Sequence, residues 1–369
     1  MTRTFDVIVI GGGIIGSAVA FELSRRRIGR VGVIDHGSFG GEASVVAAGF
    51  LPVASMRAPR GLLFDIGRTS LSLYPKFLES LAEVSGERLQ LRCRGCLQLA
   101  DTAEQASILE ERVRLRRSQG LTAEYVERNV LRRDAAALAD RFEAGVLFPD
   151  EAQIDGRALL MQLRSGSAAL GATWYRGEAT LVADTNVRSV STIVGGKRLS
   201  AACIVVAAGW WSVALAARLG IELPVRPARG EMIEIAGGDS LPTWVIDHDV
   251  QLIRQPDGRV WIGGLSEFDA WPTPTDAGCR NLQERAGRLW PAAVCARVID
   301  RRAGIRPCSD VRHPIIDRLP GWDNVYVATG HHRSGFLLAP LTAAVMAARI
   351  LGEGLPVENE RAVSWALPR

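Results

Sequence analysis

The chain has 369 residues, of which 47% are hydrophobic, and a formal net charge of +4. That length is more than one small domain requires, so we expect two domains with a substantial core. Arginines alternate with acidic residues, as in Arg132-Arg133-Asp134, and no basic stripe points to a nucleic-acid partner.

The first apolar run, Val7 to Ile10, has the length of a strand and leads into glycines, unlike a secretory signal. No apolar stretch reaches the roughly 20 residues that cross a bilayer. We therefore expect a soluble, cytoplasmic protein with no membrane partner.

Cys93 and Cys96 form a C-x-x-C, but no second such pair or histidine pair lies at ligand spacing. That favours a turn before the strand Leu97–Ala100 over a redox pair or a metal site.

A strand, a glycine turn, a helix and a second strand open the chain. Phe5 to Ile10 is rich in β-formers, a helical stretch follows, and Val31 to Ile34 predicts a second strand that ends in Asp35. The turn is a G-x-G-x-x-G, formed by Gly11, Gly13 and Gly16. These glycines let a pyrophosphate approach the helix N-terminus, and Asp35 is placed to accept from a ribose hydroxyl. The pattern predicts a dinucleotide site.

The middle of the chain changes pattern twice. Residues 61–145 are charged and helical in pattern, with helices expected over Leu71–Val84 and Thr102–Gln119, and a further helix is expected over Ala152–Gly171. Strand signals follow, with Asp257-Gly258 as a hairpin turn, at Ala201–Gly209, Glu231–Ile235, Val250–Arg254, Val260–Gly264 and Val325–Thr329. A β-rich region therefore interrupts a nucleotide-binding one.

Three expected strands end in glycine turns, VIVIGGG, VVAAGWW and YVATGHH. That is more than an NAD domain needs, and it favours a flavin dinucleotide, whose ring must be held far from its adenosine. The sequence resembles the D-amino-acid oxidase-like FAD enzymes and, within them, the glycine oxidases. The segments that carry the resemblance are VIVIGGGIIGSAVA (7–20), GGEASVVAAGFL (40–51), IVVAAGWWS (204–212), AGIRPCSDVRHPIID (303–317) and VATGHHRSGFLLAPLTA (327–343).

The resemblance implies an α/β fold with a Rossmann-type FAD-binding domain, like that of D-amino-acid oxidase and glutathione reductase. A substrate domain of antiparallel strands and helices would be inserted into it. We predict an FAD-binding domain of residues 1–85, 146–222 and 296–369, and a substrate-binding domain of residues 86–145 and 223–295.

The resemblance also places the cofactor residue by residue. Asp35 would bind the adenosine ribose with His36 beside it, and Ala179 would contact the adenine through its backbone. The pyrophosphate would lie at Gly11, Gly13, Ile14, Ile15 and Gly16. The diphosphate and flavin would be lined by Ala43, Ser44, Ala48, Gly49 and Phe50. The flavin's pyrimidine end would be wrapped by His331, His332, Arg333, Ser334, Gly335, Phe336 and Leu337, and Gly330, Ala208 and Gly209 would also bind the cofactor. Backbone N–H groups of this turn, and the dipole of a helix that starts near Leu338, would face the charge that collects at that end.

The substrate site is expected around two arginines of the last two segments, Arg306 and Arg333. A guanidinium matches a carboxylate bidentately and keeps its charge, so we assign the substrate carboxylate to Arg306. Glycine oxidases carry a tyrosine where this chain has Gln251, and commonly Asn where it has Ser334. The predicted substrate-binding residues are Arg306, Arg333, Gly49, Phe50 and Gln251.

We predict oxidation of a C–N bond beside a carboxylate, with no residue acting as an acid or base. Backbone carbonyls around Gly49 and Arg333 would accept from the amine, hydride would pass to flavin N5, and O₂ would reoxidise the flavin to give H₂O₂. The change from tyrosine to Gln251 favours an N-substituted glycine, such as an N-carboxymethyl amino acid, over glycine itself. Water would hydrolyse the resulting imine, so the products would be glyoxylate and a primary amine.

Three alternatives stay open from the sequence: a plain glycine or D-amino acid oxidase, an amine dehydrogenase that passes electrons to a quinone or a protein, and a non-catalytic flavoprotein. Cys308 does not stand where a covalent flavin would need it, so we predict non-covalent FAD. No carboxylate cluster accompanies His331 and His332, so no metal is expected. The expected partners are a small amino acid or amine and O₂, and self-association stays open.

Overall fold

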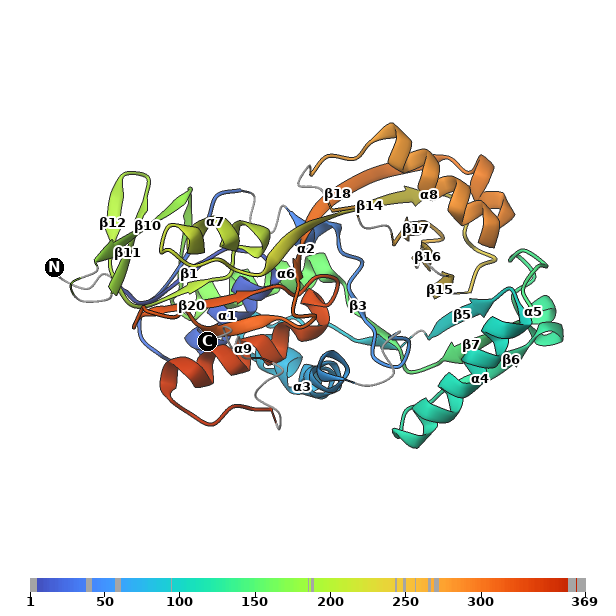
Figure 1. Cartoon of the computed structure of the whole chain (residues 1–369), viewed down its shortest axis with the longest axis horizontal. Helices are drawn as coiled ribbons and strands as arrows, with labels where there is room; N and C mark the ends of the chain where they lie inside the picture. The colour runs from blue at the N-terminus through green and yellow to red at the C-terminus, as the bar shows by residue number, and fades with distance from the viewer. Residues whose placement is uncertain are drawn as a thin grey trace.

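Two large sheets, connected by a pair of long strands, organise the chain in the computed structural model (Figure 1). The structure describes residues 5–37, 42–56, 61–93, 95–184, 186, 189–242, 244–247, 250–255, 257–264, 267–268, 272–357 and 363. Gly40 and Gly41, which begin the family-like segment 40–51, lie outside the described residues.

The first sheet has six strands in the order β19-β20-β13-β1-β2-β9. Every neighbouring pair is parallel except β19 and β20. Central parallel strands are buried on both faces, which explains their continuous apolar runs. The strands are β1 (Phe5–Ile10), β2 (Val31–Asp35), β9 (Thr173–Arg176), β13 (Ala201–Val206), β19 (Ile315–Arg318) and β20 (Val325–Thr329).

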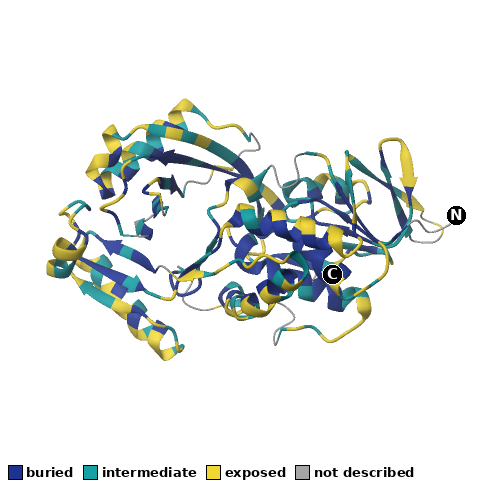
Figure 2. Ribbon diagram, turned by 180° about the vertical axis from the view of Figure 1, so that it is seen from behind, coloured by how far each residue is buried: buried dark blue, intermediate teal, exposed yellow. Residues whose placement is uncertain are grey.

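Side chains that alternate along β1 enter two different cores. Val7 and Val9 pack with the helices α1 (Ile14–Arg25), α3 (Leu62–Ser85), α6 (Gly156–Ala169) and α9 (Gly335–Leu351). Ile8 and Ile10 pack on the other face, toward β10 (Ala179–Asp184), β11 (Ser189–Val194), β12 (Lys197–Leu199), η1 (Gly209–Trp211) and α7 (Ser212–Ala217). Figure 2 shows the resulting concentration of buried residues in α1, α9 and the strands beside them.

The second sheet has eight strands in the order β18-β14-β17-β16-β15-β5-β7-β6. The helix α8 (Asp276–Leu289) packs on one face and α4 (Ala103–Ser118) on the other. The strands are β5 (Cys96–Ala100), β6 (Glu124–Glu127), β7 (Ala144–Phe148), β14 (Val225–Ile235), β15 (Trp244–Asp247), β16 (Val250–Arg254), β17 (Val260–Gly263) and β18 (Val298–Ser309). The remaining elements are α2 (Ala43–Val46), α5 (Arg128–Asp134), η2 (Pro291–Cys295), β3 (Phe50–Leu51), β4 (Arg92–Cys93) and β8 (Ala152–Gln153).

The long strands β14 and β18 pair antiparallel from Val225–Ser309 to Ile235–Val298 (Figure 1). They extend from the first sheet along the edge of the second, so residues on their inner face are shared by both halves of the molecule. The two-domain division that the sequence predicts stays a proposal, with β18 placed in the larger sheet.

Most expected elements are present, but several boundaries are corrected. The helix expected over Leu71–Val84 begins at Leu62, and the strand expected over Glu231–Ile235 begins at Val225. The expected helix over Ala152–Gly171 begins only at Gly156, because Ala152–Gln153 pairs with β3 and Asp155 caps the helix by accepting from the Ala158 N–H at 2.9 Å. The last helix begins at Gly335, earlier than the expected start near Leu338. Its first turn therefore lies directly after the paired histidines.

The start of α9 is held by α3 because Pro340 interrupts the helix. Pro340 has no N–H to give to the carbonyl of Phe336, and the Tyr74 hydroxyl donates to that carbonyl at 2.5 Å instead. One residue along, the Ser70 hydroxyl donates to the Leu337 carbonyl at 2.6 Å. Two side chains of α3 thus replace hydrogen bonds that a proline-free helix would make itself.

We predict that Tyr74→Phe lowers the free energy of unfolding by about 1–3 kcal/mol, because the buried Phe336 carbonyl would lose its donor. Chemical denaturation of wild type and variant measures this. Ser72→Ala is the control, since the Ser72 hydroxyl is exposed and bonds only the Thr69 carbonyl of the same helix. Equal stability of Tyr74→Phe and wild type would contradict the assignment.

Candidate functional site

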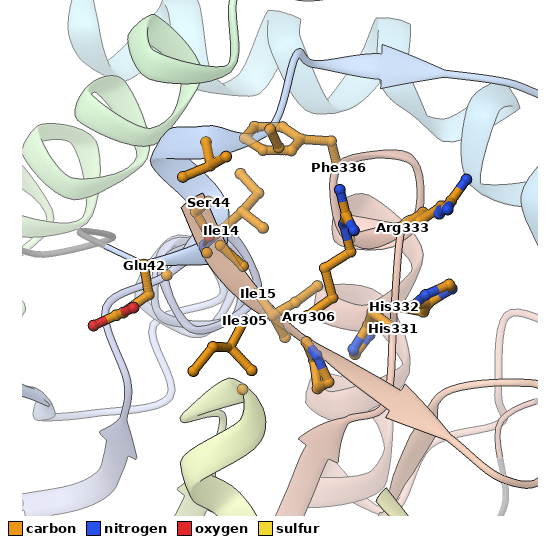
Figure 3. A pocket seen from close by; sticks show the side chains of 18 of the residues that line it. Ile14, Ile15, Glu42, Ser44, Ile305, Arg306, His331, His332, Arg333 and Phe336 are labelled. Carbon is orange, nitrogen blue, oxygen red and sulfur yellow. Dashed lines mark hydrogen bonds between the residues drawn. The ribbon is translucent and has the colours of Figure 1, made fainter. Parts of the chain in front are cut away.

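A cavity of about 1020 Å³ lies where the two sheets meet. Its wall includes the carboxyl ends of β1, β2, β13 and β20, the first turns of α1 and α9, and one face of the larger sheet. In Figure 3, Arg306, Arg333 and His332 gather on one side of it, and Glu42 and Ser44 lie on the opposite side. Doubly wound folds bind ligands in such crevices at the carboxyl ends of strands.

The glycines at the end of β1 leave no room for side chains. Gly11 has φ 112°, and a Cβ there would lie 2.3 Å from the Ala207 carbonyl oxygen. A Cβ at Gly16 would lie 1.9 Å from the Gly11 carbonyl oxygen. The turn therefore packs directly against the strand β13 and the helix α1. Its glycines place backbone atoms, and no side chains, at the cavity wall.

The carboxylate of Asp35 is fixed by this turn. Its two oxygens accept from the Gly12 N–H at 2.6 Å and the Gly37 N–H at 2.9 Å. Two residues along the same turn, the Ser44 hydroxyl oxygen accepts from the Ile14 N–H at 3.0 Å. The pKa of Glu42 is raised, mainly because the carboxyl group is partly buried. The nearby His36 acts in the opposite direction and lowers this pKa.

The wall fits an elongated dinucleotide at both of its ends. Neither α1 nor α9, both wholly within the described residues, has an acidic side chain in its first turn. Both helix N-termini thus present N–H groups and a positive dipole end to the cavity. A pyrophosphate suits the bare glycine turn before α1, and an electron-accepting ring suits the N-terminus of α9.

The paired histidines before α9 are structural and neutral. Burial lowers the pKa of His331 to about 3, and its Nε2 lies 2.9 Å from the Thr342 hydroxyl. Burial, with Arg333 and Arg306 nearby, lowers the pKa of His332 to about 4. His332 has φ 49°, and its N–H donates to the Pro307 carbonyl at 2.8 Å. The turn is therefore bound to β18 and to α9 rather than poised for proton transfer.

Arg306 lies on the inner face of β18, with its guanidinium against the neighbouring strand. A Cβ at Gly230 of β14 would lie 2.1 Å from the Arg306 Cζ and from both of its terminal nitrogens. Burial, with Arg333 as the second cause, lowers the pKa of Arg306 to about 10, so it stays charged at neutral pH.

Arg333 is exposed, and its Nη2 donates to the Gly264 carbonyl at 2.5 Å, which joins the α9 turn to the end of β17.

One row of residues crosses the larger sheet and faces the cavity. The pairing register aligns Gln98 with Ile246, Ile246 with Gln251, Gln251 with Gly263, and Gly263 with Met232. All five line the cavity. We call this set, Gln98, Ile246, Gln251, Gly263 and Met232, the sheet row.

The loop after β3 closes another part of the wall through Ser55 and Met56. Its backbone polar groups are bound by two buried side chains from distant elements. Glu151 accepts from the N–H groups of Val53 at 3.0 Å and Ser55 at 2.7 Å. Arg116 of α4 donates to the alternate carbonyls, those of Ala54 and Met56, each at 2.7 Å. Glu151 thus binds N–H groups of the loop and Arg116 binds its carbonyl groups, so both kinds of backbone polar group have buried partners.

Most of the sequence-predicted residues line this one cavity. Three predicted cofactor residues, Gly16, Gly330 and Leu337, lie behind the wall, so we propose that they shape it rather than contact a ligand. The Gly49 carbonyl, predicted to accept from the substrate amine, already accepts from the Ile154 N–H at 2.9 Å. The predicted residues in the wall are Gly11, Gly13, Ile14, Ile15, Asp35, His36, Ala43, Ser44, Ala48, Gly49, Phe50, Ala179, Ala208, Gly209, Gln251, Arg306, His331, His332, Arg333, Ser334, Gly335 and Phe336.

Several residues of the cavity wall are not among those predicted from the sequence. Gln98 could have been noticed, because it is a polar residue at an inward position of the apolar strand CLQLA. Trp244 stacks on Phe50 with ring centroids 3.8 Å apart, a contact that depends on tertiary structure alone. Others that were missed are Glu42, Met56, Arg218, Met232 and Ile246.

Within the described ranges, no three His, Cys, Asp or Glu side chains are grouped so as to hold a metal ion. None of the described helices has both the length and the apolar character needed to cross a membrane.

Comparisons with known proteins place this architecture in one family. A family model described as "FAD dependent oxidoreductase" matches residues 6–349. A glycine oxidase of Geobacillus kaustophilus (strain HTA426) is 31% identical over 353 residues, which cover 94% of this chain and 93% of that protein.

Solved structures agree with this placement. The crystal structure of glycine oxidase from Geobacillus kaustophilus has a TM-score of 0.91 and 27% identity, covering 99% of this chain and 100% of that one. An iminodiacetate oxidase from Chelativorans sp. BNC1 has a TM-score of 0.86 and 25% identity, covering 97% of this chain and 98% of that one. The predicted α/β fold and the predicted family resemblance are confirmed.

We predict that His331→Gln reduces the acid sensitivity of the fold. The pKa of His331 is lowered on folding, so the unfolded chain binds the proton first as pH falls below about 6.5. Stability is thus fully present above that pH and is lost as pH falls toward the folded pKa of about 3. Between pH 7 and pH 5 this one group costs about 2 kcal/mol.

Chemical denaturation at both pH values measures this difference, with His313→Gln, outside the cavity, as the control. The wild type and the control should lose more stability than His331→Gln. An equal loss in all three would show that His331 does not cause the acid sensitivity.

Proposed function

Because this chain belongs to the family of FAD dependent oxidoreductases, we propose that it oxidises the C–N bond of a glycine unit whose nitrogen carries a substituent. The observation that carries the proposal is the charged guanidinium of Arg306, lying flat on Gly230 in the wall of the cavity. A planar, permanently charged fork in this position matches the carboxylate of an amino acid.

The cofactor would lie along the cavity from α1 to α9. Asp35 would hold the ribose, the turn before α1 would hold the pyrophosphate, and the backbone from His331 to Gly335 would face the flavin ring. When bound, FAD accepts two electrons from the substrate carbon as hydride and passes them to O₂, which gives H₂O₂. Attachment would be non-covalent, with Cys308 half-buried on β18 and absent from the cavity wall.

The charges around the substrate favour a neutral amine. Arg306 and Arg333 would repel an ammonium group, and burial and these arginines keep the pKa of His332 at about 4. His332 is therefore a weak base, and no acid–base step is assigned to it. The chain would act by position: Arg306 fixes the carboxylate, and the wall aligns the adjacent carbon with the cofactor.

The sheet row supports a substituent on the nitrogen. The row has Ile246 and Gln251 on neighbouring strands and no side chain at Gly263, so the wall recedes there. Gln251, where glycine oxidases carry a tyrosine, supplies an amide in place of a ring. The likeness to an iminodiacetate oxidase supports the same substrate class, a glycine with a carboxymethyl group on nitrogen.

A substrate series tests the proposal. The purified protein should be yellow, and anaerobic addition of substrate should bleach its flavin absorbance. We expect kcat/KM for sarcosine, iminodiacetate and N-carboxymethyl amino acids to exceed that for glycine and D-alanine, with H₂O₂ formed in step with substrate loss. A tenfold preference for glycine that persists in Gln251→Tyr would instead support a plain glycine oxidase. Dye reduction without H₂O₂ would indicate a dehydrogenase.

A further inference from the structure

Gln98 lies at the end of the sheet row that is farthest from Arg306. It pairs with Ile246 across β5 and β15, and Ile246 pairs in turn with Gln251 across β15 and β16. Both glutamines line the cavity, one on each side of Ile246. The wall therefore offers amide groups at two different distances from the carboxylate anchor.

A hydrogen bond fixes the orientation of the Gln98 amide. Nη1 of Arg112, on α4, donates to Gln98 Oε1 at 2.6 Å. A guanidinium has donors only, so the amide oxygen must face Arg112. The NH₂ group of Gln98 is therefore the part of the amide that can donate to a ligand. The positive charge on Arg112 polarises the amide and strengthens that donor.

The acidic side chains in the described part of the cavity wall are placed or paired so that they do not repel an anion near the sheet row. Asp35, Glu42 and Glu178 belong to the adenosine end, beside the glycine turn and Ala179. Glu231 is the acid on the substrate side, and it is paired with the Arg229 Nη2 at 3.0 Å and with the Thr275 hydroxyl at 3.0 Å. The cations beside the row are Arg306 and Arg333 in the wall, and Arg112 lies behind Gln98.

Distance separates Gln98 from the glycine part of a substrate. The Arg306 guanidinium lies on β14, and β17, β16 and β15 stand between β14 and β5. Four strand spacings amount to roughly 19 Å between the backbones of β14 and β5, and only the Gln98 side chain remains to shorten this distance. A glycine or an iminodiacetate held at Arg306 is too short to reach Gln98.

We propose that Gln98, oriented by Arg112, is a specificity-determining donor for a carboxylate at the far end of a long N-substituent. This inference rests on the proposed function and names its substrate class more narrowly: glycines whose nitrogen carries a chain that ends in a carboxylate several bonds away. Gln98 contacts the substrate, and Arg112 acts through Gln98 as a positioning residue.

The test uses the flavin-loaded enzyme and two matched series. N-(ω-carboxyalkyl)glycines of increasing length are compared with N-alkylglycines of the same length. In the wild type, kcat/KM should favour the acid over the alkyl compound once the chain spans the row. In Gln98→Met, which keeps the size but removes the donor, that preference should fall by about 10- to 150-fold. The loss should appear in KM with kcat unchanged, because the distal contact is the same in the ground and transition states.

Arg112→Met should weaken the same preference, and it should add nothing in a Gln98→Met background, since it acts through that amide. Arg114→Met is the matched control, because Arg114 lies on the same helix and makes only an exposed pair with Glu110 at 3.9 Å. A second readout needs no turnover: linear α,ω-dicarboxylates of sufficient length should raise the thermal midpoint of the wild type more than that of Gln98→Met.

The two proposals fail in different ways. If no N-substituted glycine bleaches the flavin, the proposed function is wrong. If N-alkylglycines are oxidised but a terminal carboxylate brings no advantage, or Gln98→Met keeps that advantage, only the role of Gln98 is overturned. Additive effects of Arg112→Met and Gln98→Met would show that Arg112 does not act through Gln98.

Discussion

The packing of the Arg306 guanidinium against Gly230 is the contact on which the site depends. It occurs on the inner face of the β14–β18 pair, whose strands belong to the larger sheet yet reach the turn before α9. Any side chain at Gly230 would occupy the space of the guanidinium. The backbone of β14 at Gly230 thereby determines where the charged Arg306 side chain of β18 lies in the cavity wall.

Backbone polar groups in the elements around the cavity are hydrogen-bonded by side chains from elements distant in the sequence. Tyr74 and Ser70 of α3 complete the hydrogen bonds that Pro340 removes from α9, and this positions the first turn of α9 at the cavity. Arg116 and Glu151 hold the loop after β3 by its carbonyl and N–H groups. These hydrogen bonds form without a ligand, and a binding site whose backbone is already held in place loses less conformational entropy on binding.

From the sequence, the glycine turn and its neighbours could be predicted more completely than the part of the cavity wall that the larger sheet forms. The glycine turn and Asp35 are local in sequence, and the structure places them together as expected. The role proposed for Gln98 depends on strand order and on Arg112 from a separate helix, and no local sequence pattern indicates either. The start of α9 was misplaced because Pro340 weakens the helical signal, and its compensation by Tyr74 comes from another element.

Binding of a simple carboxylate to Arg306→Lys tests the central claim most directly. Glycolate has the carboxylate of a glycine but no amine, and its dissociation constant can be read from the perturbation of the flavin absorbance. We expect Arg306→Lys to retain flavin and to bind glycolate about 10- to 150-fold more weakly, because lysine keeps the charge but loses the fork. Arg302→Lys, on the same strand but paired with Asp300 at 2.6 Å, should bind as the wild type does. Unchanged glycolate affinity in Arg306→Lys would place the carboxylate elsewhere and contradict the account.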